Sequence, residues 1–426
     1  MIEIQRKTIE KAILVTINTR EHSKEVVEEH LDELEFLAET AGAQTFMKII
    51  QDKDRKDPAF YLGKGKAEEI AQLAEQNEID LVLFDDDLTP VQVRNLENMI
   101  NKKVVDRSGL ILDIFASRAK TKEAKTQVEL AQLEYMLPRL TRAWTHLSKQ
   151  YGGIGTKGPG ETQIETDRRM IRNRISHLKE KLEKIESQRL VRTSSRKGLI
   201  KVSLVGYTNA GKSTLLNLLT NADVLAENKL FATLDSTTRA YELNNNQTIL
   251  LSDTVGFIRK LPAHLVASFK STLNEVREAD IILHVIDVSH PYYEDHIAVV
   301  DQTLKDLGAE KKTQLMVFNK IDMLNDKDKM NDILLKHRNS VFISAQRGIN
   351  ITGLKNKLTA IVEENYKEET VELDISKSRI VAKIHEMAEV LSTEYDEDKI
   401  LLKYRANNII SNQIKRIIHE QTNSEG

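Results

Sequence analysis

The chain alternates short apolar runs with amphipathic segments, and the spacing of the apolar positions changes twice along it. In residues 1–115, runs such as "KAILVTINT" and "IDLVLFDDDLT" are short, apolar and end in polar residues, which is typical of buried strands. The segments between them, such as "SKEVVEEHLDELEFLAETAG", have helical spacing. This alternation predicts an N-terminal α/β domain with a mostly parallel sheet over residues 1–115.

Residues 116–197 follow a different period, with two seams of apolar residues three and four positions apart. Such seams pack one helix against another, and a short connection favours an antiparallel helical hairpin. The glycine-rich loop 151–160 lies between the seams, and Pro138 should kink or interrupt the first helix. The seams are Leu130, Leu133, Leu137, Leu140, Trp144 and Leu147, followed by Ile171, Ile175, Leu178, Leu182 and Ile185.

Strands and helices alternate again over residues 198–366, which predicts a doubly wound, mostly parallel sheet. The strand-like runs there include "LIKVSLVG", "TILLSDTVG", "IILHVIDVS" and "TQLMVFNKID". A polar break at "KEETVELDISKS" then leads into residues 367–426, for which we expect a small C-terminal α+β domain. The expected fold class is therefore α/β, with the helical hairpin as a linker.

Composition narrows the class of protein. The chain has 426 residues, of which 40% are hydrophobic and 30% charged, and no cysteine. That length exceeds one hydrophobic core, and the lack of cysteine excludes disulfides and thiolate sites. No apolar run approaches the roughly 20 residues that span a bilayer. We expect a cytoplasmic monomer without a membrane span, and peripheral attachment to a membrane stays open.

Charge is unevenly distributed, although the net charge is only −3. Residues 118–197 hold 19 lysines and arginines against 9 aspartates and glutamates, so this segment carries +10 and the rest of the chain −13. A basic block in an acidic chain indicates a polyanionic partner, most simply nucleic acid. A pair of solvated helices rich in basic residues explains the same charge, and charge alone does not decide between the two.

The stretch "GYTNAGKS" at 206–213 matches G-x-x-x-x-G-K-[ST] between an apolar strand and a helix, the context that this motif requires. Backbone N–H groups of such a loop surround phosphates, and the helix N-terminus favours negative charge. Lys212 is expected to neutralise the β and γ phosphates, and the Ser213 hydroxyl to ligate Mg²⁺. The motif predicts a nucleoside triphosphate site. "LGKGK" at 62–66 is better explained by a tight turn into a helix than by a second anion site.

Three further motifs point to guanine and to hydrolysis. "NKID" at 319–322 supplies Asp322, which can accept two hydrogen bonds from guanine that adenine cannot donate, each worth roughly 1.5–3 kcal/mol. "SAQ" at 344–346 suits a backbone contact to the guanine carbonyl. In "DTVG" at 253–256, Asp253 would hold Mg²⁺ through water and the Gly256 amide would sense the γ-phosphate. The four motifs together predict a GTPase domain.

Two features of this domain stay open on the residues alone. The stretch "FATLDSTTRA" must supply a threonine to Mg²⁺, and Thr233, Thr237 and Thr238 are all candidates. Phe257 stands where signalling GTPases place a glutamine that orients the attacking water. We therefore expect slow intrinsic hydrolysis unless a partner completes the site, and a Phe257 that packs under a switch loop is compatible with this.

The combination of "GGIGTKGPGETQIETDRR", "GYTNAGKSTLLN", "LFATLDSTTR", "DTVGFIRKLP" and "NKID" resembles the HflX family of translational GTPases. The resemblance implies binding to the large ribosomal subunit and the splitting or rescue of stalled ribosomes under stress. It also selects Thr233, in "FATLD", as the magnesium threonine. A GTP-dependent switch that acts on a non-ribosomal protein or RNA partner is the alternative.

The expected site residues follow from these motifs and the resemblance. Lys212 and Gly256 are the expected catalytic residues, and the Mg²⁺ cofactor is expected on Ser213, Thr233 and, through water, Asp253. The expected contacts to GTP or GDP are Gly206, Tyr207, Thr208, Asn209, Ala210, Gly211, Lys212, Ser213, Thr214, Phe231, Ala232, Thr233, Leu234, Asp235, Asp253, Thr254, Val255, Gly256, Asn319, Lys320, Ile321, Asp322, Ser344, Ala345 and Gln346. The expected contacts to ribosomal RNA, at the tip of the basic hairpin, are Gly152, Gly153, Gly155, Lys157 and Gly160.

Overall fold

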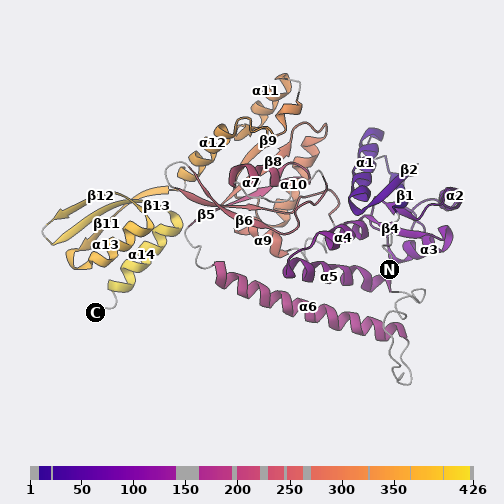
Figure 1. Ribbon diagram of the computed structural model, residues 1–426, viewed down its shortest axis with the longest axis horizontal. Helices are drawn as coiled ribbons and strands as arrows, with labels where there is room; N and C mark the ends of the chain where they lie inside the picture. Colours follow the sequence, from indigo (N-terminus) through magenta and orange to yellow (C-terminus); the bar gives the residue numbers. More distant parts are fainter. Residues whose placement is uncertain are drawn as a thin grey trace, which may run out of the picture.

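The computed structural model contains three separate sheets among the residues that it describes. These residues are 9–20, 23–140, 163–193, 199–220, 229–243, 247–261, 270–324, 327–364, 366–396 and 398–422. A six-stranded sheet lies in the middle of Figure 1, with the N-terminal sheet towards one end and the C-terminal sheet at the other. The expected α/β class is confirmed.

The N-terminal sheet is parallel, with strand order β2-β1-β3-β4, as the alternation of strands and helices predicts. Side-chain caps begin two of its helices: Ser23 accepts a hydrogen bond from the Val26 amide at the start of α1, and Thr89 and Gln92 form a capping box at the start of α3. The elements are β1 (Glu10–Asn18), α1 (Lys24–Ala41), β2 (Ala43–Asp52), α2 (Lys64–Gln76), β3 (Leu81–Phe84), α3 (Pro90–Ile100), β4 (Lys103–Asp106) and α4 (Arg107–Arg118).

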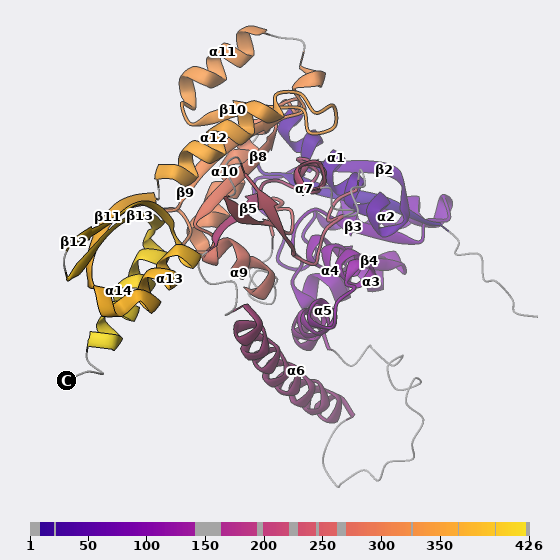
Figure 2. The same ribbon diagram turned by 60° about the vertical axis from the view of Figure 1, so that its left-hand side comes forward.

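The expected helical hairpin is present. Helix α5 (Lys122–Met136) packs against α6 (Gln163–Thr193), and both views show the two lying side by side (Figures 1 and 2). Leu178, in the middle of the second seam, is fully buried, and the other seam residues of α6 are partly buried. The two apolar seams therefore pack against each other within the chain.

Pro138 interrupts the first helix, as expected. Helix α5 ends at Met136, and the chain continues as the single 3₁₀ turn Leu137–Arg139. Trp144 and Leu147, which the seam also included, lie outside the described residues.

The central sheet has strand order β10-β9-β8-β5-β7-β6, and only the edge strand β6 is antiparallel. Strand β5 lies between β7 and β8, so its carboxyl end falls where the winding of the sheet reverses. Open α/β sheets bind ligands at this point. The elements are β5 (Ile200–Val205), α7 (Lys212–Thr220), β6 (Thr237–Glu242), β7 (Thr248–Asp253), α9 (Lys270–Glu278), β8 (Ile281–Asp287), α10 (Tyr293–Asp306), β9 (Thr313–Asn319), η5 (Ile321–Met323), α11 (Lys327–Lys336), β10 (Ser340–Phe342) and α12 (Ile351–Glu364).

The C-terminal part is the expected α+β unit, with the antiparallel sheet order β11-β13-β12 and two helices packed against it. Its elements are β11 (Tyr366–Asp374), η6 (Ile375–Lys377), α13 (Ser378–Met387), β12 (Glu389–Asp396), β13 (Lys399–Asn407) and α14 (Asn408–Thr422). Across the described stretches, no helix combines the length and apolar character needed to cross a membrane.

Candidate nucleotide site

The four predicted motifs follow four parallel strands and meet at one edge of the central sheet. "GYTNAGKS" follows β5, "DTVG" begins at the last residue of β7, "NKID" begins at the last residue of β9, and "SAQ" follows β10. Because carboxyl ends of parallel strands share an edge, segments up to 140 positions apart in the sequence come together here.

Two glycines of the first loop are required by close approach. A Cβ on Gly206 would lie 2.1 Å from the carbonyl oxygen of Val285, on the neighbouring strand β8. A Cβ on Gly211 would lie 2.3 Å from the side-chain nitrogen of Asn319, and Gly211 also has a φ of +95°. The loop can therefore pass this close to the strand ends only with glycine at both positions.

Lys212 is the buried cation of the loop. Its Nζ donates hydrogen bonds to the carbonyl oxygens of Gly206 at 3.0 Å and Tyr207 at 2.9 Å. Burial lowers the pKa of Lys212 to about 8, and the nearby Asp253 carboxylate opposes this shift. An anion beside this ammonium would stabilise its charge, which suits a phosphate site.

The three predicted magnesium residues lie together. Ser213 Oγ donates to Asp253 Oδ2 at 2.6 Å and lies 2.7 Å from Thr233 Oγ1. Asp253 is fully buried, and its Oδ1 has no hydrogen-bond partner among the described residues. Mg²⁺ prefers such hard oxygen ligands. An oxygen set with one unsatisfied carboxylate oxygen therefore fits the ion that the motif implies.

Of the three candidate threonines, Thr233 is the one whose hydroxyl reaches Ser213. Thr238 Oγ1 instead contacts Ser252 Oγ at 2.9 Å. Thr237 is the first residue of β6 and lies opposite Asp253 in the antiparallel pairing of β6 with β7. The geometry thus favours the threonine that the family resemblance selects.

The "DTVG" loop packs directly on the phosphate loop. A Cβ on Gly256 would lie 2.7 Å from Thr208 Cα, and the Phe257 amide donates to the Gly206 carbonyl at 3.1 Å. The Phe257 side chain is 1% exposed and packs in a core cluster with Val205 and Leu273. It therefore faces the core and offers nothing to a water molecule.

Asn319 connects the first loop to the "SAQ" loop. Its Nδ2 donates to the Ala210 carbonyl at 2.9 Å, and its Oδ1 accepts from the Ala345 amide at 2.9 Å. The Asp322 carboxylate lies 3.1 Å from the Arg347 guanidinium. A hydrogen bond from Ser344 lowers the pKa of Asp322, so this carboxyl is ionised at neutral pH and able to accept hydrogen bonds from a base.

A small cavity of about 50 Å³ lies among these loops. Apart from Lys229, all the residues that line it belong to the predicted contact set. Sequence reasoning missed Lys229. It directly precedes "LFATLD", and a basic residue beside a phosphate-binding stretch could have indicated it. The lining residues are Thr208, Asn209, Gly211, Lys212, Ser213, Thr214, Lys229, Phe231, Ala232, Thr233, Thr254 and Gly256.

Asp235 was expected to contact the nucleotide, but the structure places its carboxylate elsewhere. It accepts hydrogen bonds from the Lys120 amide at 3.1 Å and from the amide and hydroxyl of Thr121, the residue that caps α5. Phe231 packs edge-on against Phe115 of α4, with ring centroids 4.7 Å apart. The "FATLD" segment is thus held by α4 and α5 as well as by the phosphate loop.

Residues after "DTVG" are bound into a buried cluster of charges on the N-terminal domain. Arg107 donates to Asp85 at 2.8 Å and to the Arg259 carbonyl at 3.2 Å. Arg259 donates to Asp85 at 3.0 Å, and Lys260 lies 2.9 Å from the same carboxylate. Burial alone would raise the pKa of the Asp85 carboxyl, but these cations outweigh it and lower the pKa. Arg107 and Arg259 lower the pKa of Glu33 in the same way. Sequence reasoning missed this contact because its partners are more than 150 positions apart.

The predicted RNA contacts Gly152, Gly153, Gly155, Lys157 and Gly160 lie outside the described residues. At the turn before α2, the Gly63 amide donates to Gln51 Oε1 at 2.9 Å. That hydrogen bond is consistent with the tight-turn interpretation of "LGKGK".

Family models match three consecutive parts of the chain. One described as "GTP-binding GTPase N-terminal" matches residues 28–116, one described as "GTP-binding GTPase Middle Region" matches 118–196, and one described as "50S ribosome-binding GTPase" matches 201–320.

Individual relatives match most of the chain. GTPase HflX of Flavobacterium psychrophilum is 50% identical over 374 residues, which cover 86% of this chain and 90% of the relative. GTPase HflX of Escherichia coli is 44% identical over 376 residues, covering 87% and 88%. A solved structure of a GTP-binding protein from the hyperthermophilic archaeon Sulfolobus solfataricus, in complex with GDP, is 26% identical with a TM-score of 0.44 and covers 84% of this chain and 99% of that one. Given these identities over nearly the full length of the relatives, the chain belongs to the HflX family of GTPases.

Proposed function

We propose that the chain hydrolyses GTP with Mg²⁺, and that its nucleotide state controls binding to the large ribosomal subunit, where it splits or rescues stalled ribosomes. The observation that carries the proposal is the convergence of Lys212 with the Ser213, Thr233 and Asp253 oxygens at the carboxyl ends of the strands. This is the constellation that phosphoryl transfer to water needs.

The chain's own residues supply positioning and charge. Lys212, freed from the two carbonyls that it now contacts, neutralises the β and γ phosphates, and the Gly256 amide donates to the γ-phosphate. Ser213, Thr233 and, through water, Asp253 would hold Mg²⁺, which neutralises phosphate charge when bound. Asn319 keeps the phosphate loop and the "SAQ" loop in register, and Asp322 accepts hydrogen bonds from guanine.

Water positioning is the part that these residues leave incomplete. Because Phe257 is buried in the core, the residue after "DTVG" cannot orient the attacking water. We expect slow hydrolysis by the chain alone and faster hydrolysis when a bound partner orders the loops.

The ribosomal partner is supported by the charge of the hairpin and by the relatives. The hairpin segment 118–197 carries +10, which suits contact with RNA phosphates. The model that matches residues 201–320 is described as a 50S ribosome-binding GTPase. A switch that docks helices of a protein partner is less favoured, because α5 and α6 already bury their apolar seams against each other.

The test is the GTP hydrolysis rate of the full chain with and without purified large ribosomal subunits. We expect strong stimulation by the subunits, and tighter co-sedimentation with a non-hydrolysable GTP analogue than with GDP. Absence of co-sedimentation in both nucleotide states would rule out the ribosomal role and leave the hydrolysis proposal standing.

A second experiment distinguishes the role of the glycine-rich loop 151–160 from that of the phosphate loop 206–213. Replacing Gly152, Gly155 and Gly160 together with alanine should weaken subunit binding and leave GTP affinity unchanged. A fall in GTP affinity instead would contradict this assignment of the two loops.

A further inference from the structure

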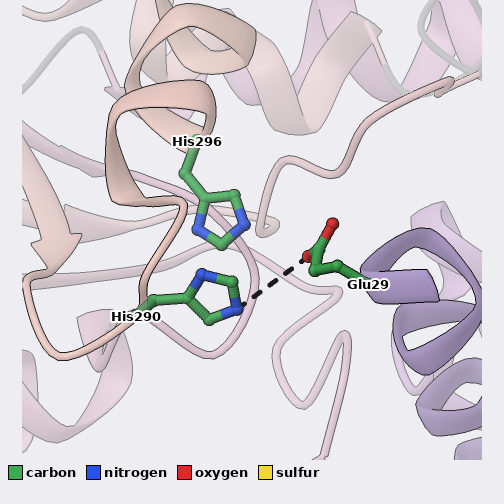
Figure 3. Close-up of side chains that lie close together, drawn as sticks. All are labelled: Glu29, His290 and His296. Carbon is green, nitrogen blue, oxygen red and sulfur yellow. Dashed lines mark ion pairs between the residues drawn. The ribbon is translucent and has the colours of Figure 1, made fainter. Parts of the chain in front are cut away.

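Three metal-ligating side chains meet outside the phosphate cavity, at the boundary between the N-terminal domain and the central sheet. Glu29 projects from α1, His290 from the turn after β8, and His296 from the first turn of α10 (Figure 3). One ligand atom of each lies within 4.8 Å of the other two. His290 Nε2 lies 3.9 Å from Glu29 Oε1.

From this juxtaposition we infer that Glu29, His290 and His296 bind one divalent transition-metal ion of the Zn²⁺ type. Two imidazoles and one carboxylate are the donor set of open, three-ligand zinc sites, which keep a fourth position for water. Imidazole donors select such ions over Mg²⁺ and Ca²⁺, which prefer oxygen ligands. The site is therefore chemically distinct from the oxygen set around Ser213.

The required adjustment is small. Ligand atoms about 2.0–2.1 Å from a tetrahedral ion lie about 3.3 Å from one another. From separations of at most 4.8 Å, the three side chains need to close by no more than about 1.5 Å, within the reach of side-chain rotation. The Tyr292 amide donates to His290 Nδ1 at 3.2 Å, so coordination through Nε2 moves the ring proton to Nδ1 and breaks that hydrogen bond.

Neighbouring residues hold His296 in place before any ion binds. Its ring stacks on Tyr207 with centroids 3.8 Å apart and an interplanar angle of 6°. Tyr207 is itself fixed, because its hydroxyl contacts Glu33 and accepts a hydrogen bond from the Arg259 amide at 3.0 Å. Supporting contacts of this kind orient a metal ligand and reduce the loss of side-chain freedom on binding.

The surroundings favour a cation. The three residues line a cleft of about 450 Å³ that carries further carboxylates. The other acidic residues of this cleft are Glu25, Glu28, Asp32, Glu33 and Asp287, of which Glu33 and Asp287 are already paired with Arg259 and Lys320. Tyr207 and Asn209 of the phosphate loop also line it, so an ion here would clamp α1 to the central sheet beside that loop. This inference rests on these contacts and does not depend on the proposed function.

The experiment is equilibrium binding of Zn²⁺ to the full-length, untagged protein after dialysis against a chelator. A chromophoric chelator serves as competitor, and millimolar Mg²⁺ is present to fill oxygen sites such as that around Ser213. We expect one Zn²⁺ per chain. Visible absorption of Co²⁺ in the same protein should report a low coordination number and nitrogen ligands.

Three variants and one control decide whether these residues hold the ion. Glu29→Gln, His290→Ala and His296→Phe, the last of which keeps the ring stack on Tyr207, should each weaken binding about tenfold or more. His177→Ala, at an exposed position of α6, should bind as the parent does. Circular dichroism checks that each variant is folded. The inference is overturned if no Zn²⁺ binds, or if folded variants bind it as tightly as the parent.

Discussion

At the scale of single residues, His284 makes stability depend on pH. It lies fully buried in β8, where burial and then Lys212 and His337 lower its pKa to about 3 from an ordinary value of 6.5. Between these values the unfolded chain binds a proton that the folded chain does not. Stability should therefore fall as the pH drops below 6.5, by roughly 1 kcal/mol between pH 7.5 and pH 5.5 for this group alone.

His284→Leu should remove that contribution. Denaturant unfolding of the parent and the variant at both pH values measures it, because other, partly buried histidines such as His30 and His296 contribute equally to both proteins. An identical loss of stability in the two proteins would show that His284 titrates normally in the folded state.

A second residue-scale prediction concerns Asn319, whose side chain joins two nucleotide loops by two buried hydrogen bonds. Asn319→Ala leaves the Ala210 carbonyl and the Ala345 amide without this partner, at a cost of about 1–3 kcal/mol each. We expect GTP and GDP affinity to fall by at least about tenfold in calorimetry. Asn339→Ala, at an exposed asparagine, is the matched control. Unchanged affinity in Asn319→Ala would show that the loops hold their positions without it.

At the scale of elements, the "FATLD" segment is anchored to the start of α5 through Asp235. Asp235→Ala should release this anchor and increase hydrogen exchange of residues 230–236. GTP affinity should change little, because Asp235 does not line the cavity. Glu242→Ala, exposed on β6, is the control. A large loss of GTP affinity in Asp235→Ala would instead support the expectation that Asp235 contacts the nucleotide.

The same elements show what sequence patterns can and cannot predict. The seam around Leu178 and the break at Pro138 follow from spacing and backbone chemistry within one helix, so both were predictable. The motif glycines were predictable because a loop that passes this close to neighbouring strand ends needs glycine, and the glycines stand within one short motif. Asp235 was assigned to the nucleotide because it lies in a motif, yet its partner Thr121 is 114 positions away. No local pattern encodes such a partner, and the Glu29 cluster was missed for the same reason.

At the scale of the whole molecule, two kinds of electrostatic contact should respond differently to salt. The cluster of Arg107, Asp85 and Arg259 joins the N-terminal domain to the segment after "DTVG" and is almost completely buried. Buried pairs are screened little by salt. Contacts of a basic hairpin with RNA phosphates are exposed and release counterions, so 6–10 of them lose a factor of about 10³–10⁵ in affinity between 50 and 200 mM salt.

On the proposed function, raising the salt over this range should therefore release the chain from large ribosomal subunits and leave the interdomain contact intact. Co-sedimentation measures the first effect, and hydrogen exchange of residues 256–261 measures the second. Arg259→Ala should increase exchange of that segment at both salt concentrations, because removing one partner leaves Asp85 and Glu33 with less compensating charge. Lys260→Ala, at a side chain 40% exposed, should do so much less. If salt alone opened residues 256–261, the interdomain cluster would be solvated, and its coupling to the phosphate loop through Tyr207 would be lost at physiological ionic strength.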